Sequence, residues 1–135
     1  MWELYPFSIT MTLFVMAYLF FTMAQVGAAR GKYDVKAPAC EGPDEFNRIY
    51  RVHQNTQEQL ILFLPLFILF VIVAGDKWAA PLAVLWLLGR IVYRNTYLNN
   101  PEGRAPGMIM TIGATGLCFL GVIIFAVLQV MGIAF

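Results

Sequence analysis

Long stretches without a charged side chain constrain this sequence more than any other feature. Lys, Arg, Asp and Glu are absent from residues 5–29, 59–75, 78–89 and 105–135. A bilayer core about 30 Å thick needs roughly 20 apolar residues in a helix. The first and last stretches reach that length alone. The two middle stretches reach it only if their helices continue into the charged residues beside them. The pattern indicates a membrane protein with several crossings.

Composition excludes the other broad classes of protein. The chain is 60% hydrophobic and 13% charged, with a net charge of +1. A soluble domain is about 25% charged and 45–50% apolar, and a disordered chain needs low hydrophobicity with high net charge. No basic excess indicates a nucleic-acid partner. The two cysteines are too few for a secreted disulfide scaffold.

We predict an all-α membrane protein, a bundle of four transmembrane helices that forms a single domain over residues 1–135. The helices are expected at about residues 5–29, 46–74, 78–98 and 106–131. Gly, Pro and polar residues mark the connections between them at residues 31–45, 75–77 and 99–104.

Basic residues set the expected orientation of the bundle. Lys77 is alone on one side, whereas the first and third connections and their flanks carry eight basic residues, which are Arg30, Lys32, Lys36, Arg48, Arg51, Arg90, Arg94 and Arg104. Cytoplasmic loops are enriched in Lys and Arg, so both termini are predicted to be non-cytoplasmic. The absence of a C-terminal retention signal favours a bacterial inner membrane over the ER membrane.

Polar residues form stripes on the two middle helices. Both stripes follow a spacing of three or four residues, with Arg48, Arg51, Asn55 and Glu58 on the second helix and Arg90, Tyr93, Arg94 and Tyr97 on the third. Arg30 ends the first helix and Arg104 begins the last, so every helix brings an arginine to one membrane boundary. For any single Arg or Tyr, contact with lipid headgroups is an equally good explanation. A carboxylate at the depth of Glu58 needs a partner, for which Arg51 or Asn55 could serve structurally.

Together these residues fit a small, multiply charged ligand at the membrane face. Arginines bind carboxylates in bidentate fashion, a lone carboxylate suits an ammonium group, and Asn pairs with an amide. Glutathione has two carboxylates, one amine and amide bonds. No metal is expected, because His53 is a lone histidine and the cysteines lack ligand spacing.

Three motifs resemble the MAPEG family, the membrane-associated proteins of eicosanoid and glutathione metabolism. Residues 46–58 contain its R-x-H-x-N-x-x-E core and are most similar to microsomal glutathione transferases of types two and three. Residues 89–93 with Tyr97 resemble the family's third helix. Arg104 before Ala105 and Pro106 resembles the start of the last helix in the leukotriene-conjugating synthase.

The resemblance implies a homotrimeric membrane glutathione transferase with sites between subunits. It implies glutathione binding through eight residues, which are Arg30, Arg51, His53, Asn55, Glu58, Arg90, Tyr93 and Tyr97. Arg30 and His53 match positions that reach the site from a neighbouring subunit. Arg104 matches the arginine that holds the thiolate, and Tyr93 is the second candidate for contact with sulfur. The expected second substrate is a lipophilic electrophile or a lipid hydroperoxide.

Two other classes of function stay open. One is a non-catalytic lipid-binding scaffold, as in the 5-lipoxygenase-activating member of that family. The other is a transporter or channel, because charges inside a membrane often mark ion paths. The charges here gather at one boundary, and the fourth predicted helix has no ionisable side chain after Arg104 except the weakly acidic thiol of Cys118. Both observations favour the enzyme over a transporter or channel, and a scaffold has no reason to keep the Arg-Asn-Glu set with Arg104.

Overall fold

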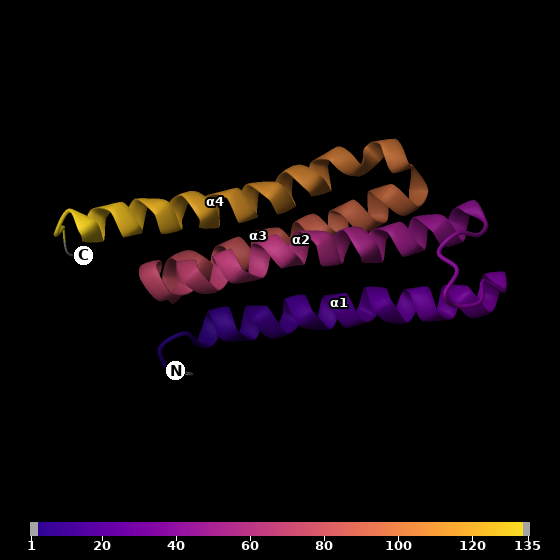
Figure 1. Ribbon diagram of the computed structural model, residues 1–135, viewed down its shortest axis with the longest axis horizontal. Coiled ribbons are helices and arrows are strands. Elements are labelled where there is room, and N and C mark those ends of the chain that lie inside the picture. Colours follow the sequence, from indigo (N-terminus) through magenta and orange to yellow (C-terminus); the bar gives the residue numbers. More distant parts are fainter. Residues whose placement is uncertain (1–2, 134–135) are drawn as a thin grey trace.

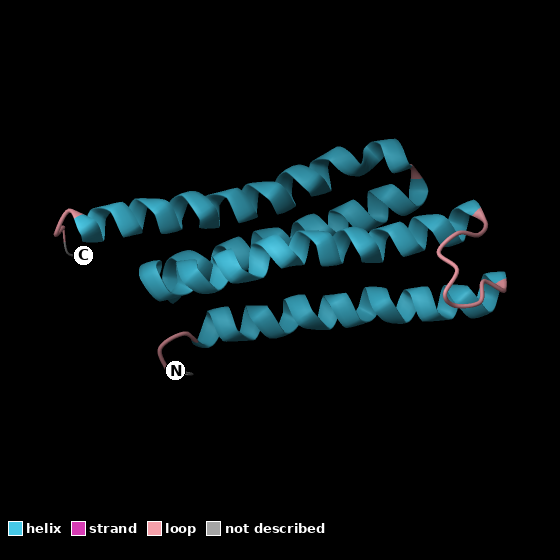
Figure 2. Ribbon diagram, viewed as in Figure 1, coloured by secondary structure: helices cyan, strands magenta, loops and turns pink. Residues whose placement is uncertain are grey.

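The computed structural model describes residues 3–133, and that part of the chain contains helices and loops but no strand. Its elements are α1 (Pro6–Tyr33), α2 (Asp44–Ala74), α3 (Asp76–Asn99), the short 3-10 helix η1 (Pro101–Arg104) and α4 (Ala105–Val130). Figure 2 shows helix along almost the whole described chain, with one long loop between α1 and α2. The prediction of an all-helical protein is confirmed.

The helices run side by side, with α2 and α3 in the middle (Figure 1). α1 packs against α2 and α3 from one side, and α4 packs against the same two helices from the other. The first and last described residues lie at one end of the bundle. The α1–α2 loop and η1 lie at the opposite end, which we call the arginine end after Arg30, Arg48, Arg51, Arg90, Arg94 and Arg104. The other is the Asp76 end.

The predicted helix boundaries are wrong by a few residues at the α1–α2 loop. α1 continues to Tyr33 and not only to residue 29, because nothing at Arg30 or Lys32 opposes a helix. It ends where Asp34 adopts the left-handed conformation, with φ of 52°. α2 begins at Asp44, two residues before the predicted start, and its acidic first turn stabilises the helix N-terminus.

The connection between α2 and α3 is tighter than the predicted turn at residues 75–77. Gly75 alone separates the two helices, and α3 already begins at Asp76. Gly75 has φ of 81°, which a glycine adopts without steric cost. The two middle helices are therefore neighbours in the chain as well as in the bundle.

Three helical segments are long and apolar enough to cross a membrane, as judged by length and composition. They are Pro6–Tyr33, Asp44–Ala74 and Pro101–Val130 within the described chain. α3 is more polar on average, because its second half carries Arg90, Arg94, Asn95 and Asn99. A fourth crossing, by α3, stays a prediction.

An aromatic cluster fills the centre of the bundle. The ring of Phe63 stacks on Phe67, with 5.2 Å between centroids, and on Trp86 across the α2–α3 seam, at 4.9 Å. Large apolar side chains such as Leu13, Ile61 and Ile124 are exposed on the outside. An exterior of this kind suits lipid, where apolar exposure carries no penalty.

Candidate functional site

The α2 stripe forms a hydrogen-bonded network at the arginine end. The Arg51 guanidinium donates to Glu58 Oε1 at 3.1 Å, and the Asn55 amide donates to Glu58 Oε2 at 3.3 Å. Arg51 to Glu58 is the one ion pair within residues 3–133, and both side chains are nearly half exposed. Exposed ion pairs contribute little to stability. The network therefore orients the charged groups, but it stabilises the protein only weakly.

The α3 stripe adds a fully buried arginine to this network. Arg90 is 0% exposed, and its Nη2 donates to Thr56 Oγ1 on α2 at 3.1 Å. The guanidinium also lies over the Tyr93 ring, 4.2 Å from its centroid. Tyr93 in turn stacks on Tyr97, with 5.3 Å between ring centroids. An arginine, two aromatic rings and one hydroxyl thus form a continuous column along the α2–α3 seam.

Arg90 retains hydrogen-bonding capacity that the described part of the chain does not use. Its Nε is buried without a partner there, and so is the amide oxygen of Asn55 on the facing helix. A buried guanidinium without a carboxylate partner costs several kcal/mol, and a buried charged group of this kind is a candidate for a functional site. The seam between α2 and α3 is therefore a candidate for binding and not only for packing.

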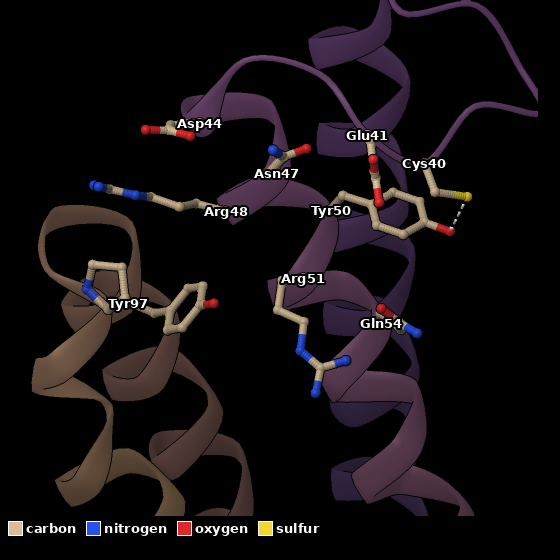
Figure 3. Close-up of a pocket in the computed structure, with 10 residues that line it drawn as sticks. Cys40, Glu41, Asp44, Asn47, Arg48, Tyr50, Arg51, Gln54 and Tyr97 are labelled. Carbon is tan, nitrogen blue, oxygen red and sulfur yellow. Dashed lines mark hydrogen bonds between the residues drawn. The ribbon is translucent and has the colours of Figure 1, made fainter.

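A cleft of about 690 Å³ opens over this seam at the arginine end. Its walls come from the α1–α2 loop, α2, the end of α3 and η1, through Cys40, Glu41, Asp44, Asn47, Arg48, Tyr50, Arg51, Gln54, Tyr97 and Pro101. Figure 3 shows the Tyr97 ring on α3 pointing across the gap toward α2, along which Arg51 extends, and the Cys40 thiol against the Tyr50 hydroxyl, at 3.1 Å. A peptide-sized molecule fits a cleft of this volume.

Arg104 joins the site from the third connection. It is the last residue of η1, it is exposed, and no side chain or carbonyl in residues 3–133 accepts a hydrogen bond from it. Gly107, three residues later, packs against the Tyr93 backbone, so Arg104 lies about one helical turn from the contact with α3. The structure therefore groups seven of the predicted site residues, which are Arg51, Asn55, Glu58, Arg90, Tyr93, Tyr97 and Arg104, and two of them, Arg51 and Tyr97, line the cleft.

Two predicted site residues lie apart from this group within the single chain. Arg30 donates to the carbonyl oxygens of Ala39, at 2.8 Å, and Val35, at 3.3 Å, and its guanidinium lies over two aromatic rings of α2. His53 points toward α1, where its Nδ1 lies 3.0 Å from Thr22 Oγ1. Arg30 thus lies behind the cleft wall at Tyr50, whereas His53 faces away from the cleft of its own chain.

Two arginines of the predicted cluster are occupied by other contacts. Arg48 lines the cleft, but its Nη1 donates to the carbonyl oxygens of Leu98, at 3.1 Å, and Asn99, at 3.4 Å, which end α3. Arg94 donates to Gln25 Oε1 on α1 at 2.8 Å. Both side chains tie helices together, and the spacing of the stripes does not distinguish them from the other arginines.

Sequence reasoning missed two residues that hold Arg90. Thr56 accepts the hydrogen bond from its guanidinium, and the Tyr18 hydroxyl of α1 donates to its backbone carbonyl at 3.0 Å. A threonine directly after Asn55 in the sequence was the available signal for Thr56. No pattern in the sequence indicates the second, because Tyr18 lies 72 residues away from Arg90.

Comparisons with known proteins match most of the chain. A family model described as the MAPEG family matches residues 8–124. An uncharacterized protein of Synechocystis is 43% identical over 119 residues, which is 82% of this chain and 85% of that protein. Microsomal glutathione S-transferase 2 of Mus musculus is 35% identical over 114 residues, or 82% of this chain and 70% of the relative. Leukotriene C4 synthase of Bos taurus is 31% identical over 106 residues, or 69% and 68% respectively.

Proposed function

The chain belongs to the MAPEG family, and from that membership and the cleft we propose that it is a membrane-embedded glutathione transferase. One observation carries the proposal. Arginine, amide and carboxylate groups of α2 lie opposite an arginine and two stacked tyrosines of α3, next to one peptide-sized cleft. Similarity to glutathione S-transferases and leukotriene C4 synthase supports glutathione as the co-substrate.

The charges of the site complement those of glutathione. Arg51 offers a planar donor pair to a carboxylate, and Glu58 offers a carboxylate to the ligand ammonium. Because these two side chains already pair with each other, a ligand that carries both charges exchanges one ion pair for two. A ligand with only one of the charges would leave a partner unpaired, which costs free energy. The site therefore favours the amino-acid end of a peptide.

The chemistry proposed for the site is stabilisation of the thiolate. A thiol has a pKa near 8.5, and lowering it by two units requires about 2.7 kcal/mol. A guanidinium beside the sulfur supplies this through a charge-assisted hydrogen bond, and we assign that role to Arg104, with Tyr93 as the alternative donor. The thiol proton leaves to solvent. The sulfur lone pair then forms a bond to an electrophilic carbon, whose leaving group departs with the displaced electron pair.

The same thiolate can reduce a lipid hydroperoxide. Its sulfur attacks the terminal oxygen, the O–O bond breaks, and a proton converts the released alkoxide to an alcohol. A second glutathione then displaces water from the sulfenic acid and forms the disulfide. Detoxification of lipophilic electrophiles and glutathione-dependent peroxidase activity are thus two outcomes of one activated thiolate.

We further propose that the site is completed in a homotrimer, with Arg30 and His53 supplied by the neighbouring subunit. His53 faces α1, away from the cleft of its own chain, and Arg30 lies behind Tyr50, which lines that cleft. The proposed setting is a bacterial inner membrane, with the arginine end cytoplasmic and both termini non-cytoplasmic. Native mass spectrometry in mild detergent tests the trimer, and a fully active monomer would exclude the shared site.

The deciding experiment is a glutathione titration of the purified protein, monitored by the ultraviolet absorbance of the thiolate. A saturable thiolate signal near neutral pH is expected, and addition of a model electrophile should then consume it. Arg51→Met is the matched variant, since it removes a charge from the cleft, and it should weaken the saturation. Binding of lipid without any thiolate signal would instead support the non-catalytic scaffold.

A further inference from the structure

α3 and α4 approach each other most closely at two glycines. A Cβ atom on Gly107 of α4 would lie 2.5 Å from the Cα atom of Tyr93, closer still to the Tyr93 amide nitrogen, and 2.7 Å from the carbonyl oxygen of Gly89. A Cβ atom on Gly89 would lie 2.8 Å from Thr111 Oγ1 and 2.9 Å from its amide nitrogen. Only hydrogen fits at either position unless the helix backbones move.

The other glycines of α4 do not share this property. A methyl group on Gly113 or Gly116 would have no atom of a neighbouring described segment within 4 Å, and Gly121 faces only the side chain of Phe70. A side chain can rotate away, whereas a helix backbone cannot. Gly107 is therefore the glycine of α4 that sets the distance to α3.

The close contact between α3 and α4 lies next to the residues that we propose act on the thiol. Gly89 and Tyr93 bound a single turn of α3, and Arg90, which stacks on Tyr93, lies within it. Arg104 precedes Gly107 by three residues, about one helical turn, in η1. Thr111 belongs to the same part of α4, because its hydroxyl donates a hydrogen bond to the Gly107 carbonyl oxygen at 2.8 Å.

We propose that Gly107 is a positioning residue for the thiolate, because the α3–α4 distance that it sets fixes where Arg104, one helical turn earlier, lies relative to Tyr93. This inference rests on the proposed glutathione transferase activity. The groups that bind the peptide lie on α2 and α3, so a change in the position of α4 moves Arg104 relative to a ligand that stays bound. A displacement of about 1 Å at a reacting centre can cost about 100-fold in rate.

The test is Gly107→Ala beside Gly113→Ala, the same substitution on the same helix where no atom is displaced. For Gly107→Ala we expect turnover at neutral pH to fall by about 10- to 100-fold. The apparent pKa of bound glutathione should rise toward that of the free thiol, and raising the pH should recover part of the rate. Glutathione affinity should change less than threefold. Gly113→Ala should match the parent protein.

The readout separates positioning from general damage. A lower melting temperature with an unchanged pH–rate profile would overturn the proposal, as would equal behaviour of the two alanine variants. If Gly107→Ala does not fold, Gly89→Ala presses on Thr111 from the other helix and should shift the profile in the same direction. The proposed function fails separately, because the parent protein would then show no glutathione thiolate at all.

Discussion

The two ends of the bundle differ in whether their charged groups find hydrogen-bond partners within the protein. At the Asp76 end, the Asp76 carboxylate accepts the backbone N–H groups of Phe7, at 2.9 Å, and Ser8, at 2.6 Å. It thereby caps α1, whose own N-cap residue makes no side-chain cap. At the arginine end, Arg104 and part of Arg90 have no hydrogen-bond acceptor within residues 3–133.

This difference distinguishes a charged group that holds helices together from charged groups that are available to a ligand. A carboxylate with both oxygens on backbone N–H groups is satisfied by the protein itself and holds α1 to the α2–α3 turn. Unused guanidinium donors keep their capacity for a ligand. Substitution of Asp76 should therefore change stability alone, whereas substitution of Arg104 or Arg90 should change binding or rate.

The largest effect is expected for Arg104→Ala. The bound thiol should lose its stabilising cation, so turnover at neutral pH should fall by about 100-fold, the usual cost of losing one such donor. More thiolate forms without help at higher pH, so part of the rate should return there. The measurement is the pH–rate profile together with the thiolate absorbance. Arg104→Lys, which keeps the charge, is the control, and an unchanged thiol pKa would transfer the role to Tyr93.

Glu58→Gln should have the next largest effect, on binding. The substitution keeps the size of the side chain but removes the charge that we assign to the ligand ammonium. Glutathione binding should weaken by about 1.5–3 kcal/mol, the range for hydrogen bonds to charged groups. Isothermal titration calorimetry measures it. If Glu58 serves only to hold Arg51 and Asn55, affinity will stay constant while thermal stability changes.

Asp76→Ala tests the opposite end of the bundle, where a change in stability alone is expected. Loss of the cap on Phe7 and Ser8 should lower the free energy of unfolding by about 0.5–2 kcal/mol, as for other capping residues. Thermal unfolding in detergent measures this, with the exposed neighbour Lys77→Ala as control. Glutathione affinity should be unchanged, and a coupled loss of affinity would show that the two ends are not independent.

The smallest effect is expected for Arg48→Met, which sharpens the comparison within the arginine end. Arg48 lines the cleft but donates to the last carbonyls of α3. Its loss should lower stability by about 0.3–1 kcal/mol, the range for a cation at a helix C-terminus. Affinity for glutathione should remain near that of the parent protein. A tenfold loss would place Arg48 among the ligand-binding arginines.

Periodicity and charge were sufficient to predict the helices and the α2 stripe. Arg51, Asn55 and Glu58 are within seven residues of one another on one helix, so their meeting follows from helical spacing alone. The same spacing gave the α3 stripe with Arg90, Tyr93 and Tyr97, and the resemblance supplied the roles of these residues and of Arg104. The structure brings these side chains together, while their roles toward glutathione stay predictions.

Contacts between distant segments could not be predicted in this way. The Asp76 cap on Ser8 joins residues 68 apart, and Arg48 reaches carbonyls 50 residues away. Glycine counts likewise do not indicate which glycine meets a backbone. Gly107 and Gly113 look equivalent in the sequence, but only the helix crossing distinguishes them. These features depend on the rotation of each helix about its axis, which a one-dimensional pattern leaves undetermined.

The single-residue turn at Gly75 bears on the order in which the protein is made. α2 and α3 form a hairpin of local contacts, and chains synthesised from the N-terminus form local contacts early. Every residue proposed to bind glutathione precedes Asn100, whereas Arg104, which is proposed to stabilise the thiolate, follows it. The nascent chain can thus assemble the peptide-binding groups of α2 and α3 before α4 has left the ribosome, and of its own site residues it acquires the reactive-centre cation last.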